Sequence, residues 1–352
     1  MIVITTPSGL IGHQVLENLL DSSEQLRLVA RDPSDLPAEV GELVEVIEGS
    51  HGDAAVVDEA FAGADAVFWL APPDPHAETV EAAYVGFTRP AAAAFKKHGV
   101  KRVVGVSALG RGTPWTAKAG YVVGSLAMDD LIASTGVGYR ALTNPSFMDN
   151  IVRQAEAIKN QGMFFSPIDG DRKLPAVATR DIAAAASRLL LDESWSGVEE
   201  VPLLGPEDLS FNDMAEIISE VLGKEVRFQQ TTFEAYKDRF VGLGMSEAMA
   251  QGMTDMAAAK NEGLDNAVKR TPENSTPTTF RQWCEEVLTP VVNRDAELGG
   301  RVPTSVAAWC ASGPYALSSA ITVRRVTPNE VSPAPSHAGE RLRAHSLARR
   351  TT

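Results

Sequence analysis

Cysteine is scarce in this sequence, which holds only Cys284 and Cys310 among its 352 residues. Two cysteines do not make a disulfide framework, so we expect a protein of the reducing cytoplasm. Long apolar runs are also missing, since none approaches the roughly 20 residues that a membrane-spanning helix needs. The first residues lack the basic and then apolar pattern of a secretory signal. The sequence therefore predicts a cytoplasmic protein that neither enters nor binds a membrane.

Positive charge is in short supply as well. The chain carries 32 Lys and Arg against 46 Asp and Glu, a formal net charge of −14. A nucleic-acid surface needs clustered basic residues, so this balance argues against a nucleic-acid partner. Residues 293–352 differ, with eight Arg, no Lys and four acidic residues. Because that stretch is rich in Ser, Pro and Ala and has no helical periodicity, we expect a tail of low order.

Residues 1–145 alternate short apolar runs with longer helical stretches. Parallel strands are buried on both faces and therefore appear as continuous apolar runs. This alternation predicts an α/β domain with a doubly wound parallel sheet. The expected strands are 2–5, 26–30, 43–47, 66–71, 102–108 and 137–142, with a first helix at 11–20.

Residues 146–292 predict a smaller mixed α/β lobe. Four methionines fall on one side of a helix there, a spacing typical of core packing, although a flexible apolar lid over a planar substrate is the alternative. They are Met245, Met249, Met253 and Met256. The expected helices are 180–191, 210–222, 232–241, 246–260 and 277–287, with strands near 200–204 and 225–229.

Residues 4–12 read "ITTPSGLIG", a strand followed by a glycine-containing turn and the start of a helix. Such a unit presents backbone N–H groups and a helix N-terminus to a pyrophosphate, as in Rossmann-type sheets. Gly9 and Gly12 occupy the second and third glycine positions of that pattern, and Thr6 replaces the first. Because Pro7 pushes the residue before it toward extended geometry, we do not expect a positive φ at Thr6.

The letters "TPSG" instead predict a type I turn with proline at its second position. Ser8 then either caps the helix or donates to a phosphate. An ordinary strand-to-helix loop is the alternative to a cofactor site.

The second predicted strand ends on "VARDP", about 20 residues beyond the turn. An acidic residue there would hold the ribose hydroxyls of NAD, whereas Arg31 suits the additional phosphate of NADP(H). The alternative is a surface arginine paired with Asp32. His51, in "GSHGD", is expected on a surface loop, and the four histidines of residues 1–292 have no metal-ligand spacing, so we expect no metal site.

In these residues and in the motifs quoted below, the chain resembles the NmrA-like atypical short-chain dehydrogenase/reductases. This family includes NADPH-dependent quinone reductases and redox sensors that are not enzymes. The resemblance covers residues 1–290 and depends on the order and spacing of its motifs. They are "ITTPSGLIG", "VARDPSDLP", "VEVIEGSHGD", "GADAVFWLAPP", "VKRVVGVSALG", "SLAMDDLIASTGVGYRALTNPSFMDN", "VATRDIAAAA" and "TPTTFRQW".

The resemblance implies a cofactor site along the carboxyl ends of the strands. Arg31 would bind the adenosine phosphate, and Ser50 would lie near the adenine, where relatives often have Asp. The pyrophosphate would be held by Thr6, Ser8, Gly9, Leu10, Ile11 and Gly12. The nicotinamide and its ribose would be bordered by Leu70, Ala71, Pro72, Ser107, Ala108, Asn144 and Pro145. The substrate pocket would be lined by Pro73, Phe147 and Met148.

Classical members of the wider superfamily use a Tyr-x-x-x-Lys pair as the proton donor. When Asp129 is taken as the acidic residue of the following helix, Tyr121 falls in the tyrosine position and Ser125 in that of the lysine. The lysine of the pair is therefore missing, and a tyrosine without a neighbouring lysine has a pKa near 10. Tyr121 and Ser107 are the candidate catalytic residues, and a packed helix aromatic is the alternative for Tyr121.

The leading hypothesis is an NADP(H)-dependent reductase that transfers hydride directly to a quinone or a similar flat, apolar acceptor. The alternative is a regulator that binds NADP(H) without turnover and reports its redox state to a protein partner. A structural protein with a decayed pocket is a third hypothesis.

Overall fold

Seven parallel strands form the main sheet of this computed structural model, which describes residues 1–37, 40 and 44–293. The strand order is β10-β6-β5-β4-β1-β2-β3, so the chain starts in the middle of the sheet and winds outward in both directions. The predicted doubly wound parallel sheet is confirmed. The strands are β1 (Ile2–Thr5), β2 (Leu26–Ala30), β3 (Glu45–Glu48), β4 (Ala66–Trp69), β5 (Arg102–Ala108), β6 (Gly138–Asn144) and β10 (Val198–Pro202).

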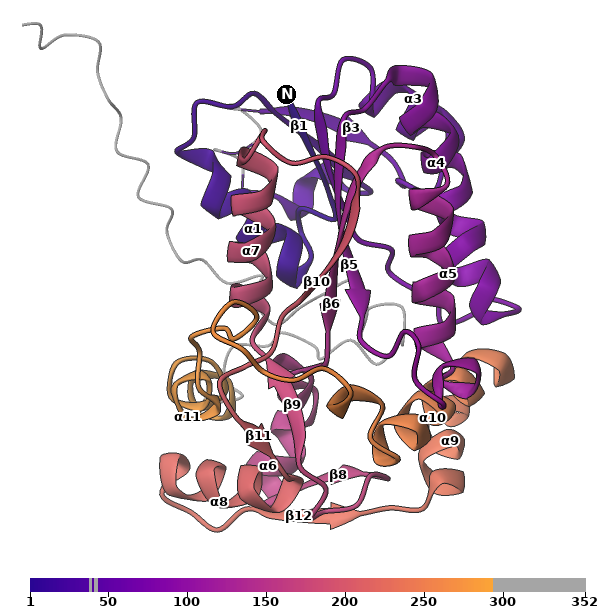
Figure 1. Cartoon of the computed structure of the whole chain (residues 1–352). Helices are drawn as coiled ribbons and strands as arrows, with labels where there is room; N and C mark the ends of the chain where they lie inside the picture. The colour runs from indigo at the N-terminus through magenta and orange to yellow at the C-terminus, as the bar shows by residue number, and fades with distance from the viewer. Residues whose placement is uncertain (38–39, 41–43, 294–352) are drawn as a thin grey trace, which may run out of the picture. The chain divides into compact units, whose positions relative to one another are not determined.

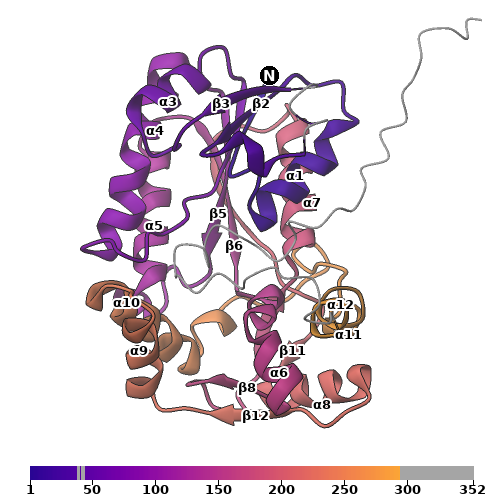
Figure 2. The ribbon, with the colours of Figure 1, turned by 180° about the vertical axis from the view of Figure 1, so that it is seen from behind.

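Helices cover both faces of this sheet (Figures 1 and 2). On one face, α1 (Leu10–Leu20) packs against α7 (Thr179–Leu191). The other face carries α3 (Ala54–Ala60), α4 (Phe87–His98) and α5 (Tyr121–Ala133). All four residues of β1 and of β4 are buried because they lie between these two layers.

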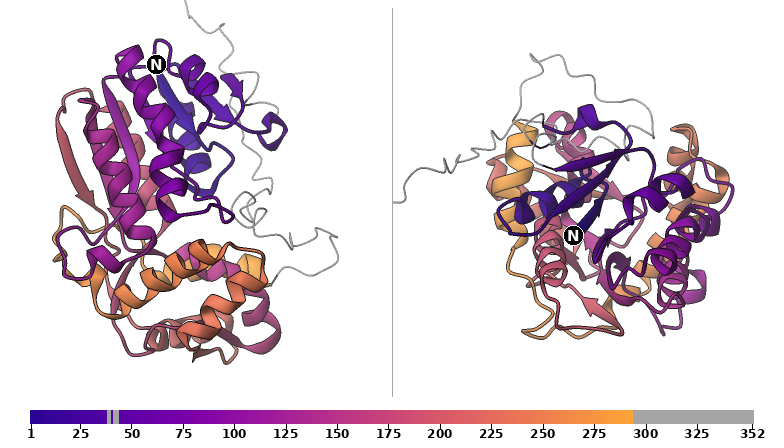
Figure 3. Two further views of the ribbon diagram at one scale, coloured as in Figure 1. Left: turned by 90° about the vertical axis from the view of Figure 1, so that its right-hand side faces the viewer. Right: turned by 90° about the horizontal axis from the view of Figure 1, so that it is seen from above.

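The smaller lobe lies beyond the carboxyl ends of the main strands (Figure 3), and its helix α10 (Glu247–Asn261) contacts α5. It contains a three-stranded sheet of order β11-β9-β7 and a parallel pair, β12-β8. Its strands are β7 (Ser146–Phe147), β8 (Met163–Ser166), β9 (Leu174–Val177), β11 (Asp208–Leu209) and β12 (Arg227–Gln230). Its helices are α6 (Ala155–Gln161), α8 (Phe211–Leu222), α9 (Phe233–Gly242), α10 (Glu247–Asn261), α11 (Phe280–Trp283) and α12 (Thr289–Val292).

Two segments that the sequence assigned to the smaller lobe belong to the layers of the main sheet. The predicted helix 180–191 is α7, which packs on α1, and the predicted strand 200–204 is β10, which pairs in parallel with β6. The chain therefore returns to the main sheet and its helices after it has entered the smaller lobe. Among the described residues, no helix is long and apolar enough to cross a membrane. The predicted tail lies, from residue 294 onward, outside the described residues.

Candidate functional site

The turn between β1 and α1 is closed by a hydrogen bond from the Gly9 N–H to the Thr6 carbonyl oxygen, at 2.9 Å. This is the bond that the "TPSG" turn predicts. The expectation for the backbone of Thr6 was wrong, because its φ is +55°. With no glycine at the first position, Thr6 itself takes the left-handed conformation that directs the chain into α1. An L-residue pays about 1–2 kcal/mol for that conformation.

Gly12 allows the helix to lie directly on this turn. A Cβ atom at position 12 would lie 2.1 Å from the Thr6 carbonyl oxygen, so only glycine fits there. The N-cap of α1 is Gly9, which has no side chain, so Ser8 does not cap the helix and stays exposed. The first N–H groups of a helix have no partner within it. The buried hydroxyl of Thr6 also has no hydrogen-bond partner among the described residues.

These features fit a bound pyrophosphate. The backbone N–H groups of Leu10, Ile11 and Gly12 open the helix, and the Thr6 hydroxyl lies in the same turn without a partner. Helix N-termini bind phosphate through such groups and through the helix dipole.

Arg31 is exposed directly after the carboxyl end of β2. Its neighbour Asp32 accepts hydrogen bonds from the Ser34 N–H at 2.9 Å and the Ser34 hydroxyl at 2.6 Å. These bonds lower the pKa of Asp32 and direct its carboxylate into the following turn. The hydroxyl of Ser50, after β3, accepts a bond from the Gly52 N–H at 3.2 Å.

His51 is buried, contrary to the expectation of a surface loop, with 5% of its surface exposed. Its Nε2 lies 2.9 Å from the Leu70 carbonyl oxygen, and because a carbonyl only accepts, Nε2 carries the proton. The ring packs edge-on against Trp69 and Phe87, with centroid separations of 5.1 and 4.8 Å. Burial lowers the pKa of His51 to about 4, so the ring is neutral. The loop after β4 folds over it.

Two side chains fix the loops at the carboxyl ends of β4 and β6. The Thr5 hydroxyl donates to the Phe68 carbonyl at 2.8 Å and accepts from the Leu70 N–H at 3.2 Å, which ties the β4 end to β1. Leu70, Ala71 and Pro72 follow this tie directly after β4.

The Asn144 amide donates to the Ser107 carbonyl oxygen at 3.1 Å and to the Leu142 carbonyl oxygen at 2.7 Å. Ala108 pairs with Asn144 in the register of β5 and β6, and Pro145 follows as a buried residue. The structure thus brings Ser107, Ala108, Asn144 and Pro145 together at the adjacent ends of β5 and β6. In the described part of the chain, the buried Oδ1 of Asn144 has no partner.

The two candidate catalytic residues lie in different environments. The Ser107 hydroxyl is 3.2 Å from the Ser125 hydroxyl, so the residue in the lysine position does reach β5. The Tyr121 hydroxyl instead lies 3.8 Å from the Met245 sulfur, in an apolar cluster that includes Met249. The interpretation of the methionine stripe as core is confirmed for Met245 and Met249, which are 5% and 0% exposed.

Sequence reasoning missed a buried acid beside Ser107. Asp129 is 4% exposed; one of its carboxylate oxygens accepts from the Ser107 hydroxyl, and the other accepts from the Tyr139 hydroxyl at 2.6 Å. Burial raises the pKa of Asp129 to about 7, against the opposite effect of these two bonds. The spacing of Ser125 and Asp129, four residues apart on one helix, puts them on the same face and could have signalled this cluster.

The predicted substrate-pocket residues differ in burial. Pro73 and Phe147 are half-buried at the junction of the lobes, whereas Met148 is 3% exposed and packs in the core of the smaller lobe.

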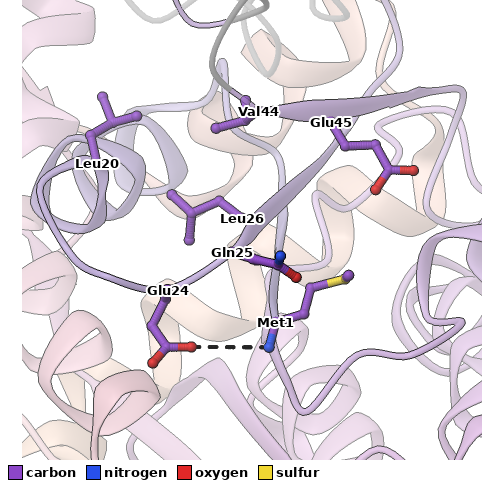
Figure 4. Close-up of a pocket in the computed structure, with 7 residues that line it drawn as sticks. All are labelled: Met1, Leu20, Glu24, Gln25, Leu26, Val44 and Glu45. Carbon is purple, nitrogen blue, oxygen red and sulfur yellow. Dashed lines mark ion pairs between the residues drawn. The ribbon is translucent and has the colours of Figure 1, made fainter. Parts of the chain in front are cut away.

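A hollow of about 480 Å³ lies at the opposite edge of the main sheet (Figure 4). There the amino group of Met1 lies 4.0 Å from a carboxylate oxygen of Glu24. Ligands of doubly wound sheets bind at the carboxyl ends of the strands. The hollow is at the amino ends, so it is separate from the candidate site. Its lining residues are Met1, Leu20, Glu24, Gln25, Leu26, Val44 and Glu45.

Comparison with known proteins agrees with this geometry. Residues 8–193, more than half of the chain, match a family described as NAD(P)H-binding, and residues 131–284 match the NmrA-like family. An NAD(P)H azoreductase of Xenophilus azovorans is 26% identical over 258 residues, which cover 73% of this chain and 86% of that protein.

Quinone oxidoreductase 2 of Escherichia coli is 23% identical over 289 residues, which cover 79% of this chain and 95% of that protein. Among solved structures, an NADPH-dependent quinone oxidoreductase from Escherichia coli in complex with NADPH superimposes with a TM-score of 0.67 at 22% identity. That match covers 80% of this chain and 98% of the other, and it shows a shared fold.

Proposed function

Because this chain belongs to the NAD(P)H-binding family, we propose that it is an NADPH-dependent reductase of quinones or similar flat, apolar acceptors. The observation that carries the proposal is the β1–α1 turn, where Gly12 lies against Thr6 and the helix start is open. The NAD(P)H-dependent oxidoreductase class follows from the relatives, which are named as reductases and oxidoreductases.

Arg31 supports the proposed preference for NADPH over NADH. Its exposed guanidinium stands after β2, and its neighbour Asp32 is bonded to Ser34. An exposed arginine at that position suits a bidentate contact with the additional phosphate.

When bound, the reduced nicotinamide would supply a hydride to the acceptor. The chain's own residues would position the two reactants. Leu70, Ala71 and Asn144 would border the ring, and Ser107 would face the reacting oxygen. The half-buried Pro73 and Phe147 would offer an apolar wall to a planar acceptor. The names of the azo and quinone reductases among the relatives support this acceptor class.

A regulator that binds NADP(H) without turnover is the second candidate. Two observations favour it: Ser125 occupies the position of the superfamily lysine, and the Tyr121 hydroxyl lies against the Met245 sulfur. This candidate needs the same cofactor site but no acceptor.

The two candidates are separated by binding and turnover measured on the full chain. NADPH and NADH are first titrated while tryptophan fluorescence is followed, because Trp69 packs directly behind the β4 loop. NADPH oxidation is then followed with menadione and duroquinone as acceptors. Binding with turnover supports the reductase, and saturable binding without turnover of any acceptor contradicts it in favour of the regulator.

A further inference from the structure

A buried chain of polar groups connects α5, β5 and β6 behind the nicotinamide end of the site. The Ser107 hydroxyl bonds to the Asp129 carboxylate and lies 3.2 Å from the Ser125 hydroxyl. The Tyr139 hydroxyl donates to the other Asp129 oxygen at 2.6 Å. The four side chains belong to residues that are between 0% and 6% exposed.

A glycine in β5 leaves space for this chain of polar groups. A Cβ atom at Gly105, in the middle of β5, would lie 2.4 Å from the Tyr139 hydroxyl. Glycine inside a strand weakens it, so its presence indicates a close approach that the fold requires. Here it lets Tyr139 cross β5 and reach Asp129.

Asp129 forms only a long ion pair. In the part of the chain that the structure describes, the nearest cationic nitrogen is Nη2 of Arg111, at 4.0 Å, and that arginine also pairs with Asp130 at 3.0 Å and with Glu200. Burying a carboxylate without a full ion pair is costly, and a buried acid of this kind lowers the cost by taking up a proton.

The polar chain has one end toward solvent and one toward the site. Arg111 and Glu200 have side chains 39% and 40% exposed, so water reaches the Arg111 side of Asp129. Ser107 lies next to the last residue of β5, and its hydroxyl is 3.2 Å from that of Ser125, which the superfamily pattern puts in the lysine position. A proton held by Asp129 therefore lies between bulk water and the reacting end of the pocket.

We propose that Asp129 acts through Ser107 as the proton source of the reduction, in place of the missing tyrosine–lysine pair. This inference rests on the proposed reductase function. A bound reduced nicotinamide would supply the hydride, which leaves an electron pair on an oxygen of the acceptor. That oxygen would take the proton of the Ser107 hydroxyl as Ser107 takes the proton of the Asp129 carboxyl group. Water on the Arg111 side would then return one proton to Asp129, so that a quinone, one hydride and one solvent proton together give a hydroquinone.

The groups that face Asp129 shift the pKa of its carboxyl group. Tyr139 from β6 and Ser107 from β5 donate to the carboxylate, and Arg111 attracts it, while Glu200 of β10 and burial favour the acid form. Burial dominates, and the pKa of Asp129 is raised to about 7. An acid with that pKa is suited to give and regain a proton near neutral pH.

The test is the pH profile of kcat for the full chain, with NADPH and menadione. We expect the wild-type kcat to be level at low pH and to fall above about pH 7, because the acid form is lost. Asp129→Asn keeps the shape of the side chain but holds no transferable acid proton. Its kcat should be lower by about 100-fold and level across the same pH range. Asp238→Asn is the matched control, because it makes the same chemical change at an exposed position on α9, and it should leave the profile unchanged.

Tyr139→Phe covers the case in which Asp129→Asn does not fold. Tyr139 donates to the ionised carboxylate, so its removal raises the pKa of Asp129 and should move the falling limb to higher pH with the low-pH kcat retained. A purely structural role would lower kcat equally at every pH. The proposal that Asp129 is the proton source is contradicted if the wild type turns over and neither variant changes the shape of the pH profile of kcat. Absence of turnover in the wild type would overturn the proposed reductase activity and the proton source with it.

Discussion

Gly12 lies so close to Thr6 that a Cβ atom at position 12 would approach the Thr6 carbonyl oxygen to 2.1 Å. This contact fixes the angle at which α1 leaves β1, and with it the direction of the helix N-terminus toward the pocket.

Gly12→Ala should therefore separate α1 from the turn. Steric overpacking of this kind costs about 1–3 kcal/mol, and we expect the free energy of unfolding to fall by that amount. The Kd for NADPH should rise at least tenfold. Gly242→Ala is the control, since a Cβ atom there meets nothing within 4 Å. Urea unfolding and fluorescence titration measure the two effects, and unchanged NADPH binding in a folded Gly12→Ala variant would contradict the assigned turn.

Thr6→Gly should stabilise the fold, because glycine tolerates the φ of +55° that threonine holds at a cost. The relief of about 1–2 kcal/mol is partly offset by the greater entropy of an unfolded glycine, so we expect a net gain of about 0.5–1 kcal/mol. Chemical denaturation at neutral pH gives the value. A loss of stability would mean that the Thr6 side chain contributes more than its backbone strain costs.

Arg31→Ala should reduce NADPH binding about tenfold or more and leave NADH binding nearly unchanged. The residue is exposed, so the melting temperature should not move. Arg89→Ala, at an exposed position on α4, controls for the loss of one positive charge. Equal losses for both cofactors would exclude Arg31 as the residue that selects the phosphate.

His51 should make the fold less stable in acid. Its pKa falls from 6.5 in the unfolded chain to about 4 in the folded one. The unfolded chain therefore binds the proton first, and stability is complete above pH 6.5 and is lost as pH falls toward 4. The full effect is about 3 kcal/mol.

His51→Gln removes this titration, and it should flatten the difference in unfolding free energy between pH 7.5 and pH 5. Asp129 acts in the opposite direction, because its raised pKa favours the folded state in acid, so only the comparison of variant and wild type isolates His51. His76→Gln, at an exposed position, is the control. An identical pH dependence in wild type and His51→Gln would show that the ring is not held neutral.

The local elements of this protein follow from the sequence because apolar runs and helix periodicity are local properties. The strands predicted at 2–5, 26–30 and 102–108 have those bounds in the structure. The helix predicted at 210–222 begins after a capping box formed by Ser210 and Asp213. The resemblance to the NmrA-like reductases is confirmed by the family matches.

The pairing of distant segments was decided by the tertiary structure. Nothing in the letters "VEEVP" of 198–202, which are exposed or half-buried, distinguishes an edge strand of the main sheet from a strand of the smaller lobe. β10 joins β6 since the chain returns through α7, which packs on α1.

The electrostatics of the site were decided in the same way. The sequence identified Ser107 as a candidate and used Asp129 only as a marker of register, whereas the fold brings the two side chains together. His51 looked like a loop residue, yet Trp69 and Phe87 enclose it. Burial and hydrogen bonding depend on which residues pack over a group, and those neighbours come from distant parts of the chain. The sequence by itself determined the strands of residues 1–145 and the place of the turn between the first strand and the first helix, and only the tertiary structure determined which polar groups are removed from water.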